Sequence, residues 1–251
     1  NPLFLLLALA LLVAQFRLPR RWAFLPLLIG ALHFQDVAVV QIGVAFTITK
    51  LVIIAGLFRA MREGSFECSR RQPLDVLVLA WAAWMLLSGL THHPRDHNPI
   101  TLRLSQIYGY AGSYFYARCF LKTREDFLRY SKAVAAVVLP LALAAVYEKF
   151  TLNSVYEWLG HGGQQLTVRN GRVRATGSFS NPILLGTYGA TAAVLIAPLF
   201  RTDKRWCFIG LIGCTLLVFC SASSGPIMTL ASALMALLLW PAPKKCLLER
   251  F

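Results

Sequence analysis

Long runs of apolar residues alternate with short polar segments along the whole chain. The runs lie at residues 2–16, 22–34, 37–58, 74–90, 100–121, 133–150, 181–200, 206–221 and 225–240. Most of them approach the roughly 20 residues that an α-helix needs to cross a bilayer, and the shorter ones can use their interfacial flanks. The pattern therefore predicts an all-α polytopic bundle of about nine transmembrane helices, forming a single transmembrane domain over residues 1–251.

The composition agrees with this class of protein. The chain is 57% hydrophobic and 14% charged, which leaves too little polar surface for a soluble domain of this length. The net charge of +14 could suggest nucleic acid, but most basic residues cluster in alternate loops. The clusters are Arg17, Arg20 and Arg21; Arg59, Arg62, Arg70 and Arg71; Arg118, Lys122, Arg124, Arg129 and Lys132; Arg201, Lys204 and Arg205; and Lys244, Lys245 and Arg250. This is the positive-inside pattern, so we expect these loops in the cytoplasm and no nucleic-acid partner.

The first apolar run has no basic segment before it and no small-residue cleavage site after it. We therefore interpret residues 2–16 as a membrane span and not as a signal peptide. Nine spans place the start of the chain outside and its end in the cytoplasm. The chain lacks an initiator methionine and stops on a basic tail just after a span. We therefore expect a fragment of a longer protein, truncated on its C-terminal side.

The long outer loop, about residues 151–180, is basic on the side of the membrane where arginine should be scarce. At its centre, Asn170-Gly171 favours the tight type I′ turn of a β-hairpin. This hairpin would place Arg169 opposite Arg172 and Thr167 opposite Arg174, so that the three arginines share one face. Opposed like charges destabilise a hairpin unless an anion lies between them, and arginine binds phosphate bidentately. The loop is therefore a candidate phosphate site.

Three predicted helix starts on the same side could contribute to this site. Ser180 or Asn181 can cap a helix that has Pro182 in its first position, and Ser224 and Asn98-Pro99 repeat the arrangement. Helix N-termini favour anions, and Arg103 could add a further phosphate contact. Simpler interpretations stay open. Outer arginines often contact lipid phosphates, the helix starts can be plain caps, and Arg103 can extend to the interface.

Three further features of the sequence are a histidine in the outer loop, a lysine within an apolar run and the cysteines. His161 in the outer loop is either a proton-transfer residue or a filler of the loop. Lys50, within an apolar run, either extends to the interface or pairs inside the bundle. The six cysteines have no metal-type spacing, so we expect neither a disulfide nor a metal site.

Residues 174–182, Arg-Ala-Thr-Gly-Ser-Phe-Ser-Asn-Pro, followed by Ile-Leu-Leu-Gly-Thr-Tyr-Gly, resemble the signature of the O-antigen ligase and O-antigen polymerase family of bacterial membrane proteins. Tyr147-Glu148-Lys149 before this segment and Ser221-Ala-Ser-Ser-Gly-Pro226 after it agree with the resemblance. Its specific part is confined to the first segment, and the rest of the chain resembles the family only diffusely.

The resemblance implies a multi-pass glycosyltransferase of the bacterial inner membrane, with a GT-C-like fold and no metal or cofactor. Such an enzyme moves glycan from an undecaprenyl-diphosphate carrier to a glycan or lipid acceptor on the periplasmic face, during lipopolysaccharide or other polysaccharide biosynthesis. It also implies that Arg174 engages the donor diphosphate, which makes it the expected catalytic residue. The expected diphosphate-binding residues are Arg169, Arg172, Arg174, Asn181, Arg103 and Ser224.

The chain departs from the family pattern in two places. A second arginine often lies in the serine-rich motif, whereas here Ser224 leads directly to Gly225. The family's proposed catalytic histidine would lie beyond Phe251. Two alternatives therefore stay open: a non-catalytic protein that binds lipid diphosphate, and a transporter of anionic glycolipids. A transporter should show paired repeats and charges along a path, whereas only Lys50 lies deep in an apolar run.

Overall fold

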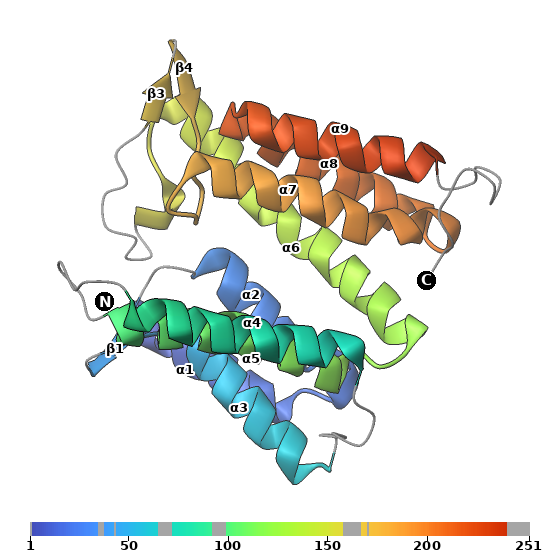
Figure 1. Ribbon diagram of the computed structural model, residues 1–251. Coiled ribbons are helices and arrows are strands. Elements are labelled where there is room, and N and C mark those ends of the chain that lie inside the picture. The colour runs from blue at the N-terminus through green and yellow to red at the C-terminus, as the bar shows by residue number, and fades with distance from the viewer. Residues whose placement is uncertain are drawn as a thin grey trace. The chain divides into compact units, whose positions relative to one another are not determined.

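The computed structural model describes residues 2–34, 38–42, 44–64, 72–91, 99–157, 167–169 and 171–239. Within these residues the chain is mainly helical, with two short antiparallel hairpins (Figure 1). The elements are α1 Pro2–Arg17, η1 Arg20–Trp22, α2 Leu25–His33, β1 Ala38–Ile42, β2 Val44–Thr47, α3 Ile48–Arg62, α4 Pro73–Leu90, α5 Pro99–Phe120, α6 Arg124–Thr151, η2 Val155–Glu157, β3 Thr167–Arg169, β4 Arg172–Arg174, α7 Pro182–Ile196, η3 Ala197–Arg201, α8 Lys204–Ser221 and α9 Ser224–Leu239. The contacts group the chain into two compact units, Asn1–Tyr130 and Ser131–Phe251.

Four helical segments of the described chain are long and apolar enough to cross a membrane. They are Pro73–Leu90, Arg124–Thr151, Pro182–Arg201 and Lys204–Ser221. Two shorter apolar helical segments, Phe4–Arg17 and Ser224–Ala236, accompany them. The mainly helical membrane class predicted from the apolar runs is confirmed at this level, while the count of nine spans stays a prediction.

Two of the predicted spans have a different structure. Residues 22–34 contain only the nine-residue helix α2, which extends about 14 Å and cannot by itself cross a hydrocarbon core of about 30 Å. Residues 37–58 begin with the β1–β2 hairpin, and the helix α3 starts only at Ile48. The run 38–47 is rich in β-branched residues, which favour strand. The helix α5 covers residues 100–120 of the predicted span 100–121 but is not among the four segments that are long and apolar enough to cross a membrane.

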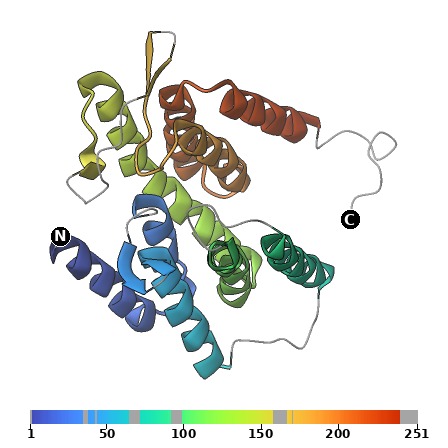
Figure 2. The ribbon, with the colours of Figure 1, turned by 60° about the vertical axis from the view of Figure 1, so that its left-hand side comes forward.

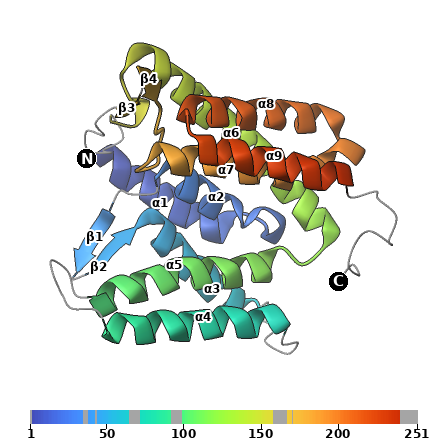
Figure 3. The same cartoon turned by 45° about the horizontal axis from the view of Figure 1, so that its top comes forward.

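In the first unit, α4 and α5 lie side by side and run in opposite directions (Figure 3). Asp75 at the start of α4 accepts hydrogen bonds from Tyr114 and Arg118 near the end of α5. Lys50 lies in the first turn of α3 and donates to Ser105 Oγ at 2.5 Å. Lys50 therefore pairs inside the unit, as one of its two interpretations expects.

In the second unit, α7 packs against both α8 and α9. Glycines allow this close approach: a Cβ at Gly189 would lie 2.9 Å from the Cys214 carbonyl oxygen, and one at Gly186 would clash with Ser221 and Pro226. Small residues at helix contacts are typical of membrane bundles. The β3–β4 hairpin stands at the end of this unit where α6 and α8 end and α7 and α9 begin (Figures 1 and 2). Four helix termini therefore lie next to the β3–β4 hairpin.

Candidate functional site

The predicted hairpin in the outer loop is confirmed, with the predicted register. Thr167 pairs with Arg174, Val168 with Val173 and Arg169 with Arg172. Gly171 has φ +70°, the left-handed conformation that a tight turn requires and that glycine adopts without strain. Asn170 lies outside the described residues. Arg169, Arg172 and Arg174 all line one pocket at the base of the hairpin, as does Val173 between them, so the prediction that the three arginines share one face stays a prediction.

Arg174 is the innermost of the three arginines. It is only 8% exposed, whereas Arg169 and Arg172 are exposed. Its Nε donates to the Ser221 carbonyl oxygen at 3.3 Å and its Nη2 donates to Ser223 Oγ at 2.5 Å. These bonds use two of the five N–H groups of the guanidinium. The end of α8 and the start of α9 therefore hold Arg174 at the floor of the pocket.

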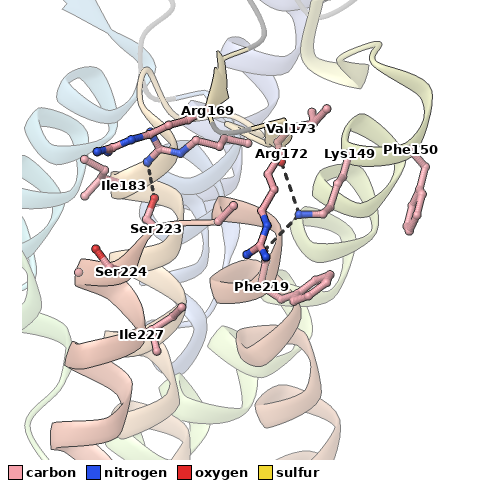
Figure 4. A pocket seen from close by; sticks show the side chains of 13 residues that line it. Lys149, Phe150, Arg169, Arg172, Val173, Ile183, Phe219, Ser223, Ser224 and Ile227 are labelled. Atoms are coloured by element: carbon pink, nitrogen blue, oxygen red, sulfur yellow. Dashed lines mark hydrogen bonds between the residues drawn. The ribbon is translucent and has the colours of Figure 1, made fainter.

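A fourth cation, Lys149, lines the same pocket from the last turn of α6. Its Nζ donates to the carbonyl oxygens of Val173 at 3.5 Å and Phe219 at 3.4 Å (Figure 4), and lies 4.6 Å from the centre of the Phe219 ring. The sequence analysis named Lys149 only within the Tyr147-Glu148-Lys149 segment that agrees with the family resemblance. A lysine at a helix C-terminus is usually explained by the helix dipole, so the sequence did not indicate these contacts.

The pocket has a volume of about 1140 Å³ and combines cationic with apolar walls (Figure 4). Its lining residues are Lys149, Phe150, Arg169, Arg172, Val173, Arg174, Ile183, Phe219, Ala222, Ser223, Ser224, Gly225 and Ile227. Among these described residues no side chain carries a carboxylate or an imidazole. Phe150, Ile183, Phe219 and Ile227 are all exposed. The site therefore presents positive charge and apolar surface together.

Two of the three predicted helix starts border this pocket. Asn181 is the N-cap of α7, because its side-chain oxygen accepts from the Ile183 amide at 2.8 Å. Ile183 in the first turn of α7 lines the pocket, as do Ser224 and Gly225 at the start of α9. The structure thus brings Ser224 to the three arginines, whereas Asn181 contacts the lining residue Ile183 and does not itself line the pocket.

The third start, α5 at Pro99, belongs to the first unit, and Asn98 lies outside the described residues. Arg103 also lies in that unit, where it donates to Gln106 Oε1 at 3.1 Å. Arg103 is not among the described residues that line the pocket, and its role in diphosphate binding stays a prediction. His161 lies outside the described residues.

The segment that follows Arg174 forms a buried turn whose partners the sequence did not reveal. Glu148, 2% exposed, accepts from Thr176 N at 2.8 Å, Thr176 Oγ1 at 2.9 Å and Gly177 N at 2.7 Å. Tyr156 of η2 is hydrogen-bonded to Ser178, and burial raises the pKa of Tyr156 above its usual range. These contacts join residues far apart in sequence, which local patterns do not predict.

Comparison of the chain with protein-family models, curated proteins and solved structures found no match. Within the described part of the chain, no group of three or more histidine, cysteine, aspartate or glutamate side chains is placed to hold a metal ion.

Proposed function

We propose that this chain belongs to a multi-pass membrane glycosyltransferase of the O-antigen ligase and polymerase type. The enzyme would transfer glycan from an undecaprenyl-diphosphate carrier to an acceptor on the periplasmic face of the bacterial inner membrane. One observation carries the proposal: four cations and four exposed apolar side chains line the same pocket. The motif 174–182, on which the family resemblance rests, supplies the innermost of those cations and the adjacent helix cap.

A lipid diphosphate fits both the cationic and the apolar walls of this pocket. Arg169, Arg172, Arg174 and Lys149 can bind the phosphate oxygens, and the guanidinium groups can do so bidentately. The amides at the start of α9, beside Ser224, are oriented to favour an anion. Phe150, Ile183, Phe219 and Ile227 would contact the first isoprenoid units of the carrier, since apolar surface favours a hydrocarbon partner.

The same cations would accelerate glycan transfer. When the sugar leaves the carrier, negative charge builds up on the departing diphosphate. Cationic groups that are already fixed in place stabilise this charge more in the transition state than in the ground state. Arg174 is the best placed, because its bonds to Ser221 and Ser223 fix its guanidinium before the donor binds.

A second candidate is a non-catalytic protein that binds lipid diphosphate. It is favoured by one observation: among the described residues that line the pocket, none is a carboxylate or an imidazole that could activate an acceptor hydroxyl. The enzyme requires such a base from another segment. The two functions share the ligand and differ only in transfer.

The experiment separates binding from transfer, with the full chain in nanodiscs. Binding is measured with farnesyl diphosphate, with farnesol and inorganic pyrophosphate as comparisons. If both the cationic and the apolar walls of the pocket bind the ligand, farnesyl diphosphate binds more tightly than farnesol or inorganic pyrophosphate. Arg172→Ala, at an exposed position, should weaken this binding, whereas Arg201→Ala in η3 at the other end of the unit should not. Equal binding of farnesol and farnesyl diphosphate would refute both candidates.

Transfer is then measured with a glycan-loaded lipid-diphosphate donor and an acceptor. Transfer that depends on Arg172 supports the glycosyltransferase. Binding that depends on Arg172, without transfer by the protein in its full natural length, assigns the non-catalytic role instead.

A further inference from the structure

The backbone immediately after Arg174 is buried, and one side chain, that of Glu148, accepts from two of its amides. Residues 174–179 are all buried, and Gly177 adopts φ +59° with Leu185 and Leu141 packed against it. Ala175 N donates to the Cys220 carbonyl oxygen at 3.0 Å. The next two amides, of Thr176 and Gly177, donate to the carboxyl group of Glu148. The path of the chain out of β4 therefore depends on Glu148.

Glu148 also holds the hydroxyl of Thr176, so both of its carboxyl oxygens are used. Among the described residues, Glu148 is the acceptor that the structure shows for these two amides, neither of which lies in a helix or a strand. A buried amide without an acceptor is costly, so loss of Glu148 would force this turn to rearrange. Arg174 is two residues away from it.

Glu148 and Lys149, two neighbouring residues in the last turn of α6, have different roles. Lys149 lines the pocket directly, whereas Glu148 points into the protein and holds the turn behind it. Arg174 is thereby fixed in two ways: its guanidinium bonds to Ser221 and Ser223 at the α8–α9 junction, and Glu148 of α6 holds the backbone two and three residues further on.

Resting on the proposed function, we propose that Glu148 is the positioning residue of the diphosphate site: it holds the backbone of Thr176 and Gly177 so that Arg174 meets the anion. Glu148 does not touch the ligand. Its effect on binding therefore passes through Arg174 and disappears when Arg174 is already altered.

The test uses the full chain in nanodiscs and farnesyl diphosphate as the probe. Glu148→Gln keeps the size of the side chain and one acceptor oxygen but turns an N–H donor toward one of the two backbone amides. We expect farnesyl diphosphate to bind about tenfold more weakly, since bonds to a charged acceptor are among the stronger ones in proteins. Thr176→Val removes only the hydroxyl bond and should cause a smaller loss. Glu157→Gln, at an exposed glutamate of η2, is the matched control and should bind as the wild type does.

A double-mutant cycle with Arg174→Lys identifies the route of the effect. If Glu148 acts through Arg174, adding Glu148→Gln to Arg174→Lys causes little further loss of binding, because contacting or coupled residues are not additive. Hydrogen exchange should rise at the amides of Thr176 and Gly177 and stay unchanged in α7 and α8. If Glu148→Gln does not fold, the same double-mutant cycle and the same hydrogen-exchange measurement are made with Thr176→Val.

Additive losses of binding, or unchanged binding in both variants, would overturn the positioning role. That failure is distinct from failure of the proposed function. If Arg174→Lys alone binds farnesyl diphosphate as tightly as the wild type, the diphosphate site itself is wrong. If Arg174→Lys weakens binding while the Glu148 and Thr176 variants do not, only the positioning role is wrong.

Discussion

Arg169 lies directly opposite Arg172 across the β3–β4 hairpin, with both side chains on the pocket side. Directly opposed like charges weaken a strand pair, by roughly 0.2–1 kcal/mol. The hairpin is only three residues long on each strand, so it has few other pairs to offset this repulsion. An anion bound between the two guanidinium groups would attract both and so offset their repulsion.

Arg169→Gln should therefore stabilise the hairpin in the absence of a ligand and weaken its response to one. Hydrogen exchange at residues 167–174 measures both effects. At low salt the variant should exchange more slowly than the wild type, while farnesyl diphosphate should protect the wild type more. At about 1 M salt the difference between the ligand-free proteins should shrink, because screening then acts over about 3 Å. Faster exchange in the ligand-free variant at low salt would contradict the repulsion.

Arg174→Lys should lose most of the binding of lipid diphosphate although the charge is kept. A lysine has one ammonium group and cannot reach both the Ser221 carbonyl oxygen and Ser223 Oγ while offering a planar pair of donors to phosphate. We expect at least a tenfold loss, and no transfer for Arg174→Ala in a protein of full natural length that still inserts in the membrane. Ser223→Ala, which removes one anchor, should give an intermediate loss. Full transfer by Arg174→Ala would remove Arg174 from the catalytic role.

Lys149→Met should reduce binding of the diphosphate and leave the contribution of the apolar tail intact. Methionine preserves the unbranched stem but loses the charge and the bonds to Val173 and Phe219. Binding of farnesyl diphosphate and of pyrophosphate should fall by the same factor, with a weaker dependence on salt than in the wild type. Lys149→Arg, which keeps the charge, is the matched control. Equal salt dependence in Lys149→Met and the wild type would exclude Lys149 from the anion site.

The helical part of the fold could largely be predicted, because apolar runs of near-membrane length leave few alternatives to helices. The run 37–58 is instructive. Hydrophobicity marks it as one element, yet β1 Ala38–Ile42 and β2 Val44–Thr47 come before α3 begins. In a continuous apolar run, periodicity cannot separate a short strand from a helix. Pairing with a second strand decides whether such a segment forms a strand or a helix, and this pairing is a tertiary contact.

The site shows the same division between local and distant information. The hairpin register and the cap at Asn181 follow from neighbouring residues, and both were predictable. Lys149 and Glu148 act through contacts with residues 24 to 70 positions away. Nothing in the Tyr147-Glu148-Lys149 segment indicates that one side chain faces the pocket and the next faces the interior. Their roles required the packing of α6 against the loop.

Asn181→Ala should destabilise the second unit, because Asn181 and not Ser180 caps α7. The Asn181 side-chain oxygen accepts from the Ile183 amide at 2.8 Å, and loss of such a cap costs about 1 kcal/mol. Ser180→Ala is the matched control and should unfold like the wild type. Thermal unfolding of both variants in nanodiscs measures the difference. An equal decrease in the two variants would mean that the cap is shared.

Asp203 should give the unit a stability that is lost in acid. It lies between η3 and α8, 2.8 Å from Lys132 Nζ, and it accepts from Trp206 N at 3.5 Å. The hydrogen bond from Lys132 holds the pKa of Asp203 below its usual value. Because the folded pKa is below the unfolded one, near 3.9, the contribution is complete above about pH 4 and declines as pH falls through the folded pKa.

Asp203→Asn keeps an oxygen for the helix cap but loses the charge. The difference in unfolding temperature between the wild type and this variant should therefore be constant from about pH 6 to pH 4.5 and shrink toward pH 3. The effect should be small and weaker in high salt, because both partners are partly exposed. Lys132→Met should shrink the same difference, since it removes the partner. Unfolding temperatures that fall in parallel for all three proteins below pH 4 would show that the Lys132–Asp203 pair adds nothing to stability.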